Sequence, residues 1–332
     1  SQMIFNGSYF VGLSAAKELI KLSKKVTKSN IIDIHETVQK AYYTTLNTKS
    51  RVDLVNDNLE RLSKLLDQTK ELYKNGFVEK LDVDRITVSY NNLLSEKVKA
   101  DRLYSLSKSV LKFQIGLSIE DKIELDGVLT DEIISDFNYD LNDFDYSNRI
   151  EYSILQSDRN LKFYDLKNNR SQFLPQVYAN YNYGFNTSTS MGNLFFETDR
   201  WKKFGTLGLK VVIPIFDGLL KRSKVNQSKY KIEQVENQIM FLERSINLQI
   251  NQSVANFENS KESLEITRKN LKLANDVYIL TEKKYKEGVG SNLEIIDSNN
   301  SLKIAQNQYF NALYECILAS IDIKKTLGIL KN

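Results

Sequence analysis

The chain has 332 residues, of which 41% are hydrophobic and 27% are charged, and its net charge is +4. Two prolines and thirteen glycines are too few for a loop-rich globular fold, so the composition favours long uninterrupted helices. The small net charge provides no basic surface for nucleic acid, and a single cysteine excludes an intrachain disulfide framework.

One sequence unit occurs twice in this chain. A shift of 212 positions aligns Tyr73-Lys74-Asn75-Gly76 with Tyr285-Lys286-Glu287-Gly288. A shift of 211 positions aligns Ile4-Phe5-Asn6-Gly7 with Ile215-Phe216-Asp217-Gly218. Because both motifs recur in the same order and at nearly the same distance, they predict an internal structural repeat.

The two copies differ in how much sequence precedes the second of these motifs. We expect the first repeat to cover residues 1–130 and the second to cover residues 131–332. About eighty residues, starting at Asp131, precede the motif in the second repeat, whereas only three precede it in the first. We therefore expect the first repeat to lack the leading helix and strand pair that the second repeat contains.

Long helices are predicted in both repeats. In the first, we expect a long helix over about residues 13–73, a tip turn and a return helix over about 82–116. In the second, we expect a leading helix, a strand hairpin, a long helix over about 219–287, a tip turn and a return helix over about 293–330. The long helix of the second repeat would extend roughly 100 Å, since an α-helix rises about 1.5 Å per residue.

Each long or return helix of the second repeat carries two stripes of side chains with a period of seven residues. Bulky side chains form one stripe, and small side chains, which let neighbouring backbones approach closely, form the other. The bulky stripes are Ile250, Phe257, Leu264, Leu271, Tyr278 and Tyr285, and then Ile295, Leu302, Tyr309, Cys316, Ile323 and Leu330. The small stripes are Ser253, Ser260, Thr267, Ala274 and Thr281, and then Ser298, Ala305, Ala312 and Ala319. The first repeat follows this pattern less strictly, with Val38, Val52, Leu59, Leu66 and Tyr73, and with Ala100 and Ser107. One hairpin cannot bury two stripes on each helix, so we expect further helices on both sides, in a bundle or in a closed ring.

A strand hairpin is predicted over about residues 174–216. Apolar and polar residues alternate over 177–185 and again over 207–215. Each run has about ten residues, the length that a tilted strand needs to cross a bilayer. The polar stretch between the runs is expected to be a surface loop beside an aromatic girdle, because it contains Phe195, Phe196 and Trp201.

The alternative interpretation of this segment is a soluble hairpin that packs on one face against a helix. Alternation alone favours that alternative, because it is a weak signal for a membrane barrel. The connection to two copies of a very long helix favours the barrel. The only prolines, Pro175 and Pro214, lie where strand gives way to helix.

The order of these features resembles the TolC family of outer-membrane efflux proteins over essentially the whole chain. The residues that carry the resemblance are the strand pair, Pro214-Ile215-Phe216-Asp217-Gly218, the Tyr285-x-x-Gly288 turn and the return helix ending in Leu327-Gly328. The resemblance implies a mainly α fold with a small β part. Long antiparallel coiled-coil helices in two structural repeats would form a periplasmic tunnel, and the strands would form part of a trimeric outer-membrane β-barrel.

The resemblance also implies a function and partners. Family members conduct substrates passively from the periplasm to the exterior, as the outer-membrane exit duct of a tripartite efflux or secretion system. The expected partners are two further copies in a homotrimer, a periplasmic adaptor (membrane fusion) protein, an inner-membrane transporter of the RND or ABC type, and outer-membrane lipid. The expected location is the outer membrane of a Gram-negative bacterium, with the helices projecting into the periplasm.

Positions that match the motifs of the family are candidate functional residues. The turns at Gly76 and Gly288 would form the periplasmic tip where the adaptor docks, although a glycine there also fits a simple helix end. Glu294 and Asp297 match an acidic ring around the aperture, where like charges would raise their own pKa values and attract cations. The alternative for these two acids is a solvated position near a helix N-terminus.

Two further groups follow from the same alignment. Asp82 and Tyr285 match the partners of a hydrogen bond that helps to hold the inner helices closed. Members of the family have a second polar link that holds the inner helices closed. We do not expect it here, because its positions are Leu81 and Gly290, whose side chains cannot form an ion pair. The junctions between strand and helix are expected at Gly7, Pro214 and Gly218.

Catalytic and metal-binding chemistry is not indicated. His35 is the only histidine, so there is no histidine cluster for a metal site or a catalytic triad. Cys316 lies on a bulky stripe and is expected to be a small core residue. We expect no enzymatic activity, no cofactor, no metal and no nucleic-acid partner. The alternative function is a soluble coiled-coil scaffold or membrane-shaping protein that binds other proteins through its helices.

Overall fold

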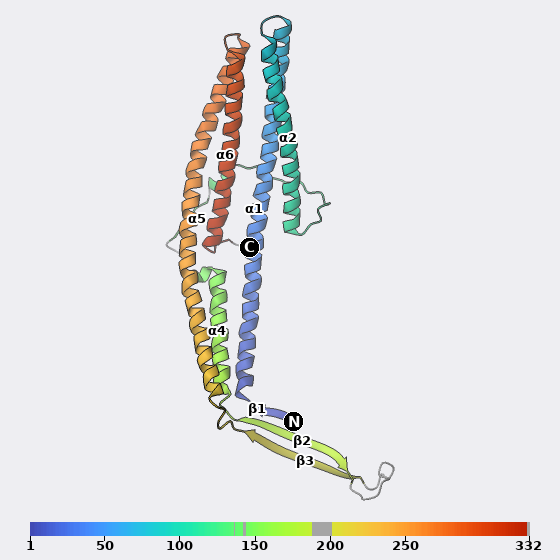
Figure 1. Cartoon of the computed structure of the whole chain (residues 1–332), viewed down its shortest axis with the longest axis vertical. Helices are drawn as coiled ribbons and strands as arrows, with labels where there is room; N and C mark the ends of the chain where they lie inside the picture. Colours follow the sequence, from blue (N-terminus) through green and yellow to red (C-terminus); the bar gives the residue numbers. More distant parts are fainter. Residues whose placement is uncertain (136, 142–143, 188–200, 331–332) are drawn as a thin grey trace. The chain divides into compact units, whose positions relative to one another are not determined.

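The protein is mainly helical, with one small sheet (Figure 1). The computed structural model describes residues 1–135, 137–141, 144–187 and 201–330. In chain order, the elements within these ranges are β1 (Gln2–Phe5), α1 (Gly7–Lys74), α2 (Lys80–Ile115), α3 (Glu132–Ser135), a 3-10 helix (Tyr146–Asn148), α4 (Ile150–Ser171), β2 (Gln176–Asn186), β3 (Lys202–Val212), α5 (Leu220–Lys286) and α6 (Asn292–Thr326). The predicted mainly α fold with a small β part is thereby confirmed. Within the described ranges, no helix contains an apolar stretch long enough to cross a membrane.

The chain folds into two compact units. The first consists of Ser1–Ser29 and Ile150–Arg244, and the second consists of Asn30–Arg149 and Ser245–Asn332. Each unit therefore combines segments of both sequence repeats. The helices α1 and α5, with 68 and 67 residues, each contribute to both units.

The sheet belongs to the first unit and contains three antiparallel strands in the order β1-β2-β3. β2 and β3 pair continuously, from Gln176 opposite Val212 to Asn186 opposite Lys202. β3 begins five residues earlier and ends three residues earlier than the predicted alternating run over 207–215. β3 ends early because Pro214 has no backbone N–H to donate to the hydrogen bonds between the strands. The predicted loop residues Phe195 and Phe196 lie outside the described residues.

The first repeat has one short strand, β1, at the place where we expect its strand pair to be missing. β1 pairs antiparallel with β2, with an irregularity between Met3 and Phe5. In the repeat alignment Met3 occupies the position of Pro214. Because Met3 has a backbone N–H, the first repeat can continue its strand to Phe5, where the second repeat has already left the sheet.

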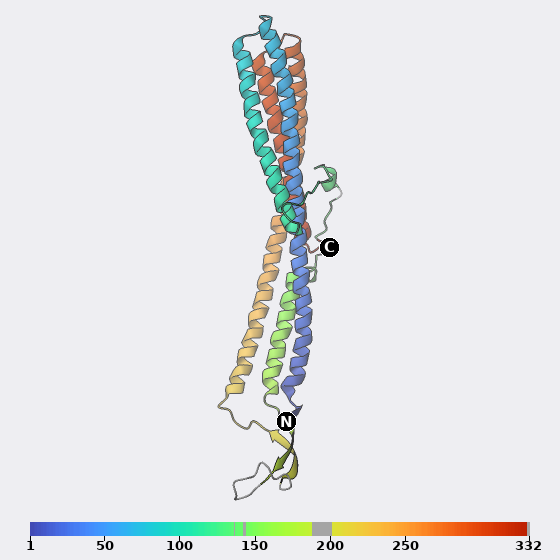
Figure 2. The same cartoon turned by 90° about the vertical axis from the view of Figure 1, so that its right-hand side faces the viewer.

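α1 begins at Gly7, six residues before the predicted start. The side-chain oxygen of Asn6 accepts a hydrogen bond from the Ser8 amide at 2.9 Å, which is the geometry of an N-cap. The prediction followed the apolar period and missed this cap. In the first unit, α1, α4 and α5 lie side by side (Figures 1 and 2). Polar contacts join them: Lys25 Nζ donates to Ser157 Oγ at 2.8 Å, between α1 and α4.

In the second unit, α1 and α2 form one helical hairpin and α5 and α6 form another (Figures 1 and 2). The bulky stripes of α5 and α6 are largely buried, as predicted, at Ile250, Phe257, Leu264, Tyr278, Tyr285, Ile295, Leu302, Cys316 and Ile323. The small stripe of α6 is buried too, at Ser298, Ala305, Ala312 and Ala319. Burial of both stripes means that α6 has neighbours on two sides within one chain.

The segment between α2 and α4 packs on the helices of the second unit. Phe137 lies edge-on against Phe257 of α5, with ring centroids 5.2 Å apart. Arg149 is 6% exposed and donates from Nη1 to the carbonyl of Thr326 at 2.8 Å. This bond satisfies one of the carbonyls that the C-terminal turn of α6 leaves without a helical partner.

Candidate functional site at the hairpin tips

Both helical hairpins turn at a glycine with a left-handed backbone. Gly76 and Gly288 have φ values of +76° and +77°. This conformation suits glycine because other residues would crowd their Cβ against the backbone. In each turn, the amide after the glycine donates to the carbonyl five residues earlier, at 2.9 Å in the first repeat and 3.1 Å in the second. The two tips therefore have the same local structure.

A pocket of about 820 Å³ lies between the two tips in the second unit. Its walls include Leu72 and Val78 from the first hairpin and Tyr285 from the second. Phe77 also lines the pocket, and this residue and Val289, one in each turn, are each 76% exposed. The tips thus present apolar side chains beside a concave surface, an arrangement that suits the docking of another protein.

Tyr285 faces inward, but its hydrogen-bond partner differs from the predicted one. Its hydroxyl lies 2.9 Å from the hydroxyl of Thr69 on α1, and both residues are buried. Asp82 Oδ1 instead accepts a hydrogen bond from Asn292 Nδ2 at 3.0 Å. In this chain the first turn of α2 faces the first turn of α6, whereas the last turn of α5 faces α1. The predicted direct bond between Asp82 and Tyr285 is therefore replaced by two separate links, each of which crosses between the hairpins.

The two acids proposed for the aperture lie on one exposed face of α6. Glu294 and Asp297 are three residues apart, so they share a side of the helix. The Oγ of Ser291 accepts the Glu294 amide at 3.2 Å and caps the helix. Ile295 is 1% exposed, so the buried face of α6 is distinct from the acidic face. Neither carboxylate has an ion-pair partner in the described part of the chain.

The corresponding positions of the first repeat are arranged differently. Arg85 Nη1 lies 3.9 Å from Asp82 Oδ1, so this carboxylate has a cation beside it on its own helix. Leu81 is exposed and carries no charge. At Gly290, an added Cβ would lie 3.0 Å from the backbone nitrogen of Tyr285, so close packing of the turn requires glycine there.

The three predicted junction residues play different structural roles in the first unit. Gly7 is helical, and an added Cβ would lie 3.0 Å from Cδ1 of Leu174. Gly218 has φ +66° and enters α5 through a turn in which Asp217 accepts the Lys221 amide at 3.0 Å. Pro214 follows the last residues of β3. Close approach favours glycine at the first junction, whereas the backbone conformation favours it at the second.

Sequence reasoning missed a row of polar contacts between α1 and α6. The pairs are Thr44 with Tyr314 at 2.8 Å, Arg51 with Asn311 at 2.8 Å and Asn58 with Gln306 at 3.2 Å. A signal for this row is present in the sequence, since Asn292, Asn299 and Gln306 recur every seven residues on α6. Polar residues that recur every seven residues indicate an interface between two helices that is partly hydrogen bonded.

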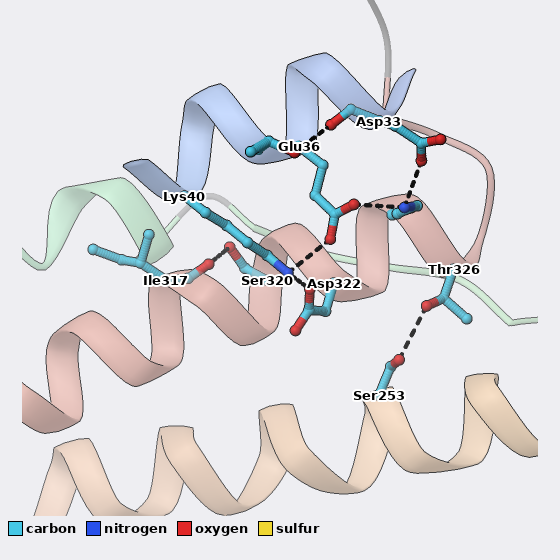
Figure 3. A network of polar contacts seen from close by, with 10 residues as sticks. Asp33, Glu36, Lys40, Ser253, Ile317, Ser320, Asp322 and Thr326 are labelled. Atoms are coloured by element: carbon cyan, nitrogen blue, oxygen red, sulfur yellow. Dashed lines mark hydrogen bonds and ion pairs between the residues drawn. The ribbon is translucent and has the colours of Figure 1, made fainter. Parts of the chain in front are cut away.

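The row ends in a network of ion pairs at the last turn of α6 (Figure 3). It connects Asp33, Glu36 and Lys40 of α1 with Asp322 and Lys325 of α6. Burial by itself would raise the pKa of Glu36, but hydrogen bonds from Lys325 and Lys40 outweigh it and hold that pKa below the ordinary 4.5. Glu36 is therefore ionised at neutral pH.

Among the residues that the structure describes, no group of three or more histidine, cysteine, aspartate or glutamate side chains could hold a metal ion. Cys316 is fully buried on α6, as predicted for a core residue. The geometry thus offers interhelical links, an exposed acidic face and a concave apolar surface at the tips.

Known structures share this fold. The outer membrane protein VceC from Vibrio cholerae matches 97% of this chain and 76% of its own chain with a TM-score of 0.76 at 13% identity. The CmeC outer membrane channel of Campylobacter jejuni matches 97% and 68% with a TM-score of 0.75 at 14% identity. At such low identity the similarity shows the fold alone.

Sequence comparison decides the family. "Outer membrane protein TolC" of Salmonella enteritidis is 21% identical over 339 residues, which cover 100% of this chain and 68% of the relative. The same protein of Escherichia coli is 20% identical over 88% of this chain and 60% of the relative. The family described as "Outer membrane efflux protein" matches residues 155–329, more than half of the chain. The chain belongs to the outer membrane efflux protein family.

Membership in this family locates the protein in the outer membrane, as predicted. "Probable efflux pump outer membrane protein TtgC" of Pseudomonas putida is 22% identical over 94% of this chain and 64% of the relative. "Alkaline protease secretion protein AprF" of Pseudomonas aeruginosa is 22% identical over 50% of this chain and 34% of the relative. These relatives support an exit channel for efflux or secretion systems, and they favour it over the alternative of a soluble scaffold. The chain spans about two thirds of the length of the TolC relatives.

Proposed function

We propose that three copies of this chain form the outer-membrane exit duct of a tripartite efflux or secretion system, through which substrates pass passively from the periplasm to the exterior. The observation that carries this proposal is the combination of family membership with helix and strand faces that a single chain leaves exposed. Such faces need partners, and a closed ring supplies a neighbour for each of them.

The exposed face of α2 supports assembly with further copies. Leu103, Leu106, Val110 and Phe113 are between 46% and 72% exposed, and their spacing of three and four residues places them on one side of the helix. On α5, Ile266, Leu273 and Leu280 form a second exposed stripe with a period of seven residues. These two stripes could bury each other when one copy meets the next, which is the contact that a homotrimer requires.

The hairpin of β2 and β3 supports contact with outer-membrane lipid. Leu207, Leu209 and Val211 alternate along β3 and are 81%, 73% and 56% exposed. Alternate apolar residues on one face of a strand of eleven residues fit the outward face of a barrel. We propose that this hairpin and its equivalents in other copies contribute to one barrel.

The hairpin tips are the proposed docking site for a periplasmic adaptor protein, which would connect the duct to an inner-membrane transporter of the RND or ABC type. The apolar side chains of Phe77 and Val289 and the pocket beside the tips support this role. Glu294 and Asp297 are proposed to form a ring of six carboxylates at the aperture, two from each copy. Such a ring would favour cations and bind multivalent cations that block the channel.

The experiment uses the full-length protein in planar lipid bilayers, with chemical cross-linking to establish its oligomeric state. We expect a trimer that conducts cations in preference to anions. The variant Glu294→Ala with Asp297→Ala should weaken block by a multivalent cation, cobalt hexammine. The matched control, Glu233→Ala with Asp276→Ala, removes two exposed acids of α5 outside the tip and should leave block unchanged.

Two results would contradict different parts of the proposal. A full-length protein that stays monomeric and does not conduct would refute the exit duct. A conducting trimer in which the Glu294 and Asp297 variant is blocked as strongly as the unmodified protein would remove these two acids from the aperture.

A further inference from the structure

A second pocket, of about 410 Å³, lies in the second unit where α1, α2, α3 and α6 meet. Aliphatic side chains form most of its walls. These are Val38, Leu111, Ile115, Ile133, Ile317 and Ile321. Ile317 and Ile321 are almost fully buried, whereas Ile115 is 45% exposed, so the pocket opens to solvent at the end of α2. A concave and largely apolar pocket of this size can hold a small organic molecule.

Some of the polar side chains that line this pocket are already engaged and others are free. Tyr42 and Ser320 donate to backbone carbonyls, at 2.8 Å and 2.7 Å. Gln39, Tyr43 and Lys324 have no hydrogen-bond or ion-pair partner in the part of the chain that the structure describes. Gln39 and Tyr43 are four residues apart on α1, so they share one side of that helix. The pocket therefore has free polar groups on both α1 and α6.

Lys324 differs from the lysines near it. Lys325 and Lys40 each lie within 2.8 Å of two carboxylates, in the network of Figure 3. The ammonium of Lys324 instead lies 5.0 Å from the ring centroid of Phe137. This cation–π contact uses the charge but no N–H donor, so the ammonium can still donate hydrogen bonds to an anion.

The charge of the pocket favours an anion over a cation. No aspartate or glutamate is among the described residues that line it, and Lys324 is its one charged side chain there. Burial, with a smaller effect of Tyr42, raises the pKa of Tyr43, so its phenol is a neutral donor at neutral pH. The amide of Gln39 can also donate. All three free groups can thus donate hydrogen bonds to a carboxylate.

We propose that this pocket, which we call the Lys324 pocket, binds an amphipathic carboxylate. The carboxylate group accepts hydrogen bonds from Lys324, and the aliphatic chain of the ligand packs against the aliphatic walls. Burial of the chain supplies affinity, and the charged hydrogen bond fixes the orientation of the ligand. The proposal goes beyond the exit duct and does not depend on it, because every lining residue belongs to one chain.

The experiment uses full-length protein in lipid nanodiscs and a photoreactive probe, decanoic acid with a diazirine near the end of its aliphatic chain. Irradiation cross-links the bound probe, and mass spectrometry of peptides locates it. The probe also dissolves in the lipid, so labelling of the scaffold protein of the nanodisc is the internal reference. We expect labelled peptides from α2 and α6 that contain Leu111 and Ile317. Absence of label from both peptides would overturn the proposal.

Two further probes test recognition of charge. They have the same chain and diazirine but end in an alcohol or an amine. We expect the carboxylate to label the pocket about tenfold more strongly than the amine, since a hydrogen bond between charged groups is of that order. Equal labelling by the carboxylate and the amine would contradict the anion site.

The role of Lys324 is tested with a matched control on α2. Lys324→Met removes the charge but keeps the length of the side chain, so labelling by the carboxylate should fall about tenfold and labelling by the alcohol should not. Lys324→Arg should retain labelling. Lys108 also lies over an aromatic ring, that of Tyr104 at 4.5 Å, but does not line the pocket. If Lys108→Met lowers labelling as much as Lys324→Met does, the ligand does not bind at Lys324.

A third comparison tests whether the probe lies inside the pocket. Ile115→Trp should fill the opening and reduce labelling by the carboxylate and the alcohol alike. Ile119→Trp is the control, because Ile119 is exposed beyond the end of α2 and does not line the pocket. Both substitutions are at exposed positions, so the helices should still fold. Unchanged labelling in Ile115→Trp would place the probe elsewhere and refute the site.

The result can be separated from other occupants and from the exit duct. A pocket that is labelled in monomeric protein but not in the trimer is covered by a second copy, and this outcome would overturn the ligand site. Chemical cross-linking and bilayer conductance are recorded for every variant. A conducting trimer with an unlabelled pocket contradicts the ligand site alone, whereas charge-selective labelling of a protein that does not conduct contradicts the duct alone.

Discussion

Asn292 and Asp82 join the first turn of α6 to the first turn of α2 through two hydrogen bonds. Asn292 Nδ2 donates to the backbone carbonyl of Asp82 at 3.1 Å and to its carboxylate at 3.0 Å. Asn292 is buried, and its own Oδ1 has no partner within the described residues. The link crosses between two hairpins from different repeats, so it bears directly on how firmly the tips are held together.

Loss of this link should loosen the tips without unfolding the hairpins. In a double-mutant cycle with Asn292→Ala and Asp82→Ala, we expect a coupling energy of about 1–2 kcal/mol, measured by thermal unfolding in detergent. The same cycle with Tyr285→Phe and Asp82→Ala should give a coupling close to zero, because those side chains have separate partners. A larger coupling in the second cycle than in the first would restore the direct bond between Asp82 and Tyr285.

Removal of one hydroxyl from the buried pair of Thr69 and Tyr285 should destabilise the protein more than removal of both. Thr69→Val leaves the hydroxyl of Tyr285 buried without a partner, so it should destabilise the protein by about 1–3 kcal/mol. Addition of Tyr285→Phe removes the orphaned hydroxyl and should recover part of that loss. Urea denaturation followed by circular dichroism measures both. If the double variant is less stable than Thr69→Val, the hydroxyl of Tyr285 has another partner.

The two tip glycines should be sensitive to any Cβ for reasons of backbone conformation alone. No atom beyond the adjacent residues lies within 4 Å of a Cβ added at Gly76 or Gly288, so the cost of Gly→Ala comes from the positive φ and should be about 1 kcal/mol at each site. Gly12 is the matched control, since it lies inside α1 and also has open space around an added Cβ. Gly12→Ala should stabilise the protein by about 0.5–1 kcal/mol. Thermal unfolding distinguishes the two signs, and a stabilising Gly288→Ala would contradict the left-handed turn.

The ion-pair network of Asp33, Glu36, Lys40, Asp322 and Lys325 should loosen in acid. The folded-state pKa of Glu36 lies below its ordinary value of 4.5, since hydrogen bonds from the two lysines outweigh the opposing effect of burial. Its contribution to stability is therefore complete above about pH 4.5 and is lost as the pH falls through the folded-state pKa. At the end of α6, the hydrogen-exchange protection factor, which is the intrinsic exchange rate at a given pH divided by the observed rate, should fall below that pH and stay constant near neutrality.

Glu60 provides the control for this pH dependence. Its carboxylate pairs with Lys64 on the surface of α1, and that pair also lowers its pKa. Glu36→Gln should abolish most of the acid-dependent loss of protection at the end of α6, whereas Glu60→Gln should leave that loss in place. Equal effects of the two substitutions would mean that the ion pairs of Glu36 do not hold the end of α6.

Tyr309 should remain protonated in strong base. Burial raises its pKa, and the hydrogen bond to Asp131, 2.8 Å away, raises it further, to about 12. Because the neutral form is favoured in the folded state, this contribution to stability is present below about pH 10 and is lost as the pH rises from 10 toward 12. Ultraviolet difference titration of the unmodified protein and of Tyr309→Phe should isolate this one late-titrating phenol. Its titration with the exposed tyrosines would contradict the hydrogen bond.

The helical stripes show why much of this fold could be predicted. Phe257, Leu264 and Ile323 were chosen for their period of seven residues alone, and all three are buried. A helix turns through a constant angle per residue, so the spacing of bulky side chains fixes which face is apolar without any tertiary information. The starts of helices were harder to predict, since α1 begins at the cap Asn6 rather than at the first apolar residue.

The tip links show where such reasoning stops. Tyr285 was expected to face inward because it ends the bulky stripe of α5, and it does. Its partner, Thr69, lies 216 positions away along the chain, and no local pattern connects the two. The alignment with the TolC family suggested Asp82 instead, since an alignment transfers positions but does not show which neighbouring side chain lies nearest.

The sequence by itself determined the helical hairpins, their glycine turns and the family of this protein, because periodicity, backbone preferences and motif order are all local or repeated properties. Only the tertiary structure decided which helix faces meet. Lys325 lies between Asp33 and Glu36 although almost three hundred residues separate them. Charged residues occur all along these helices, and antiparallel packing of α1 against α6 is what selects these three. The end of α6 is therefore held on α1 by ion pairs, whereas hydrogen bonds from uncharged donors join the tips.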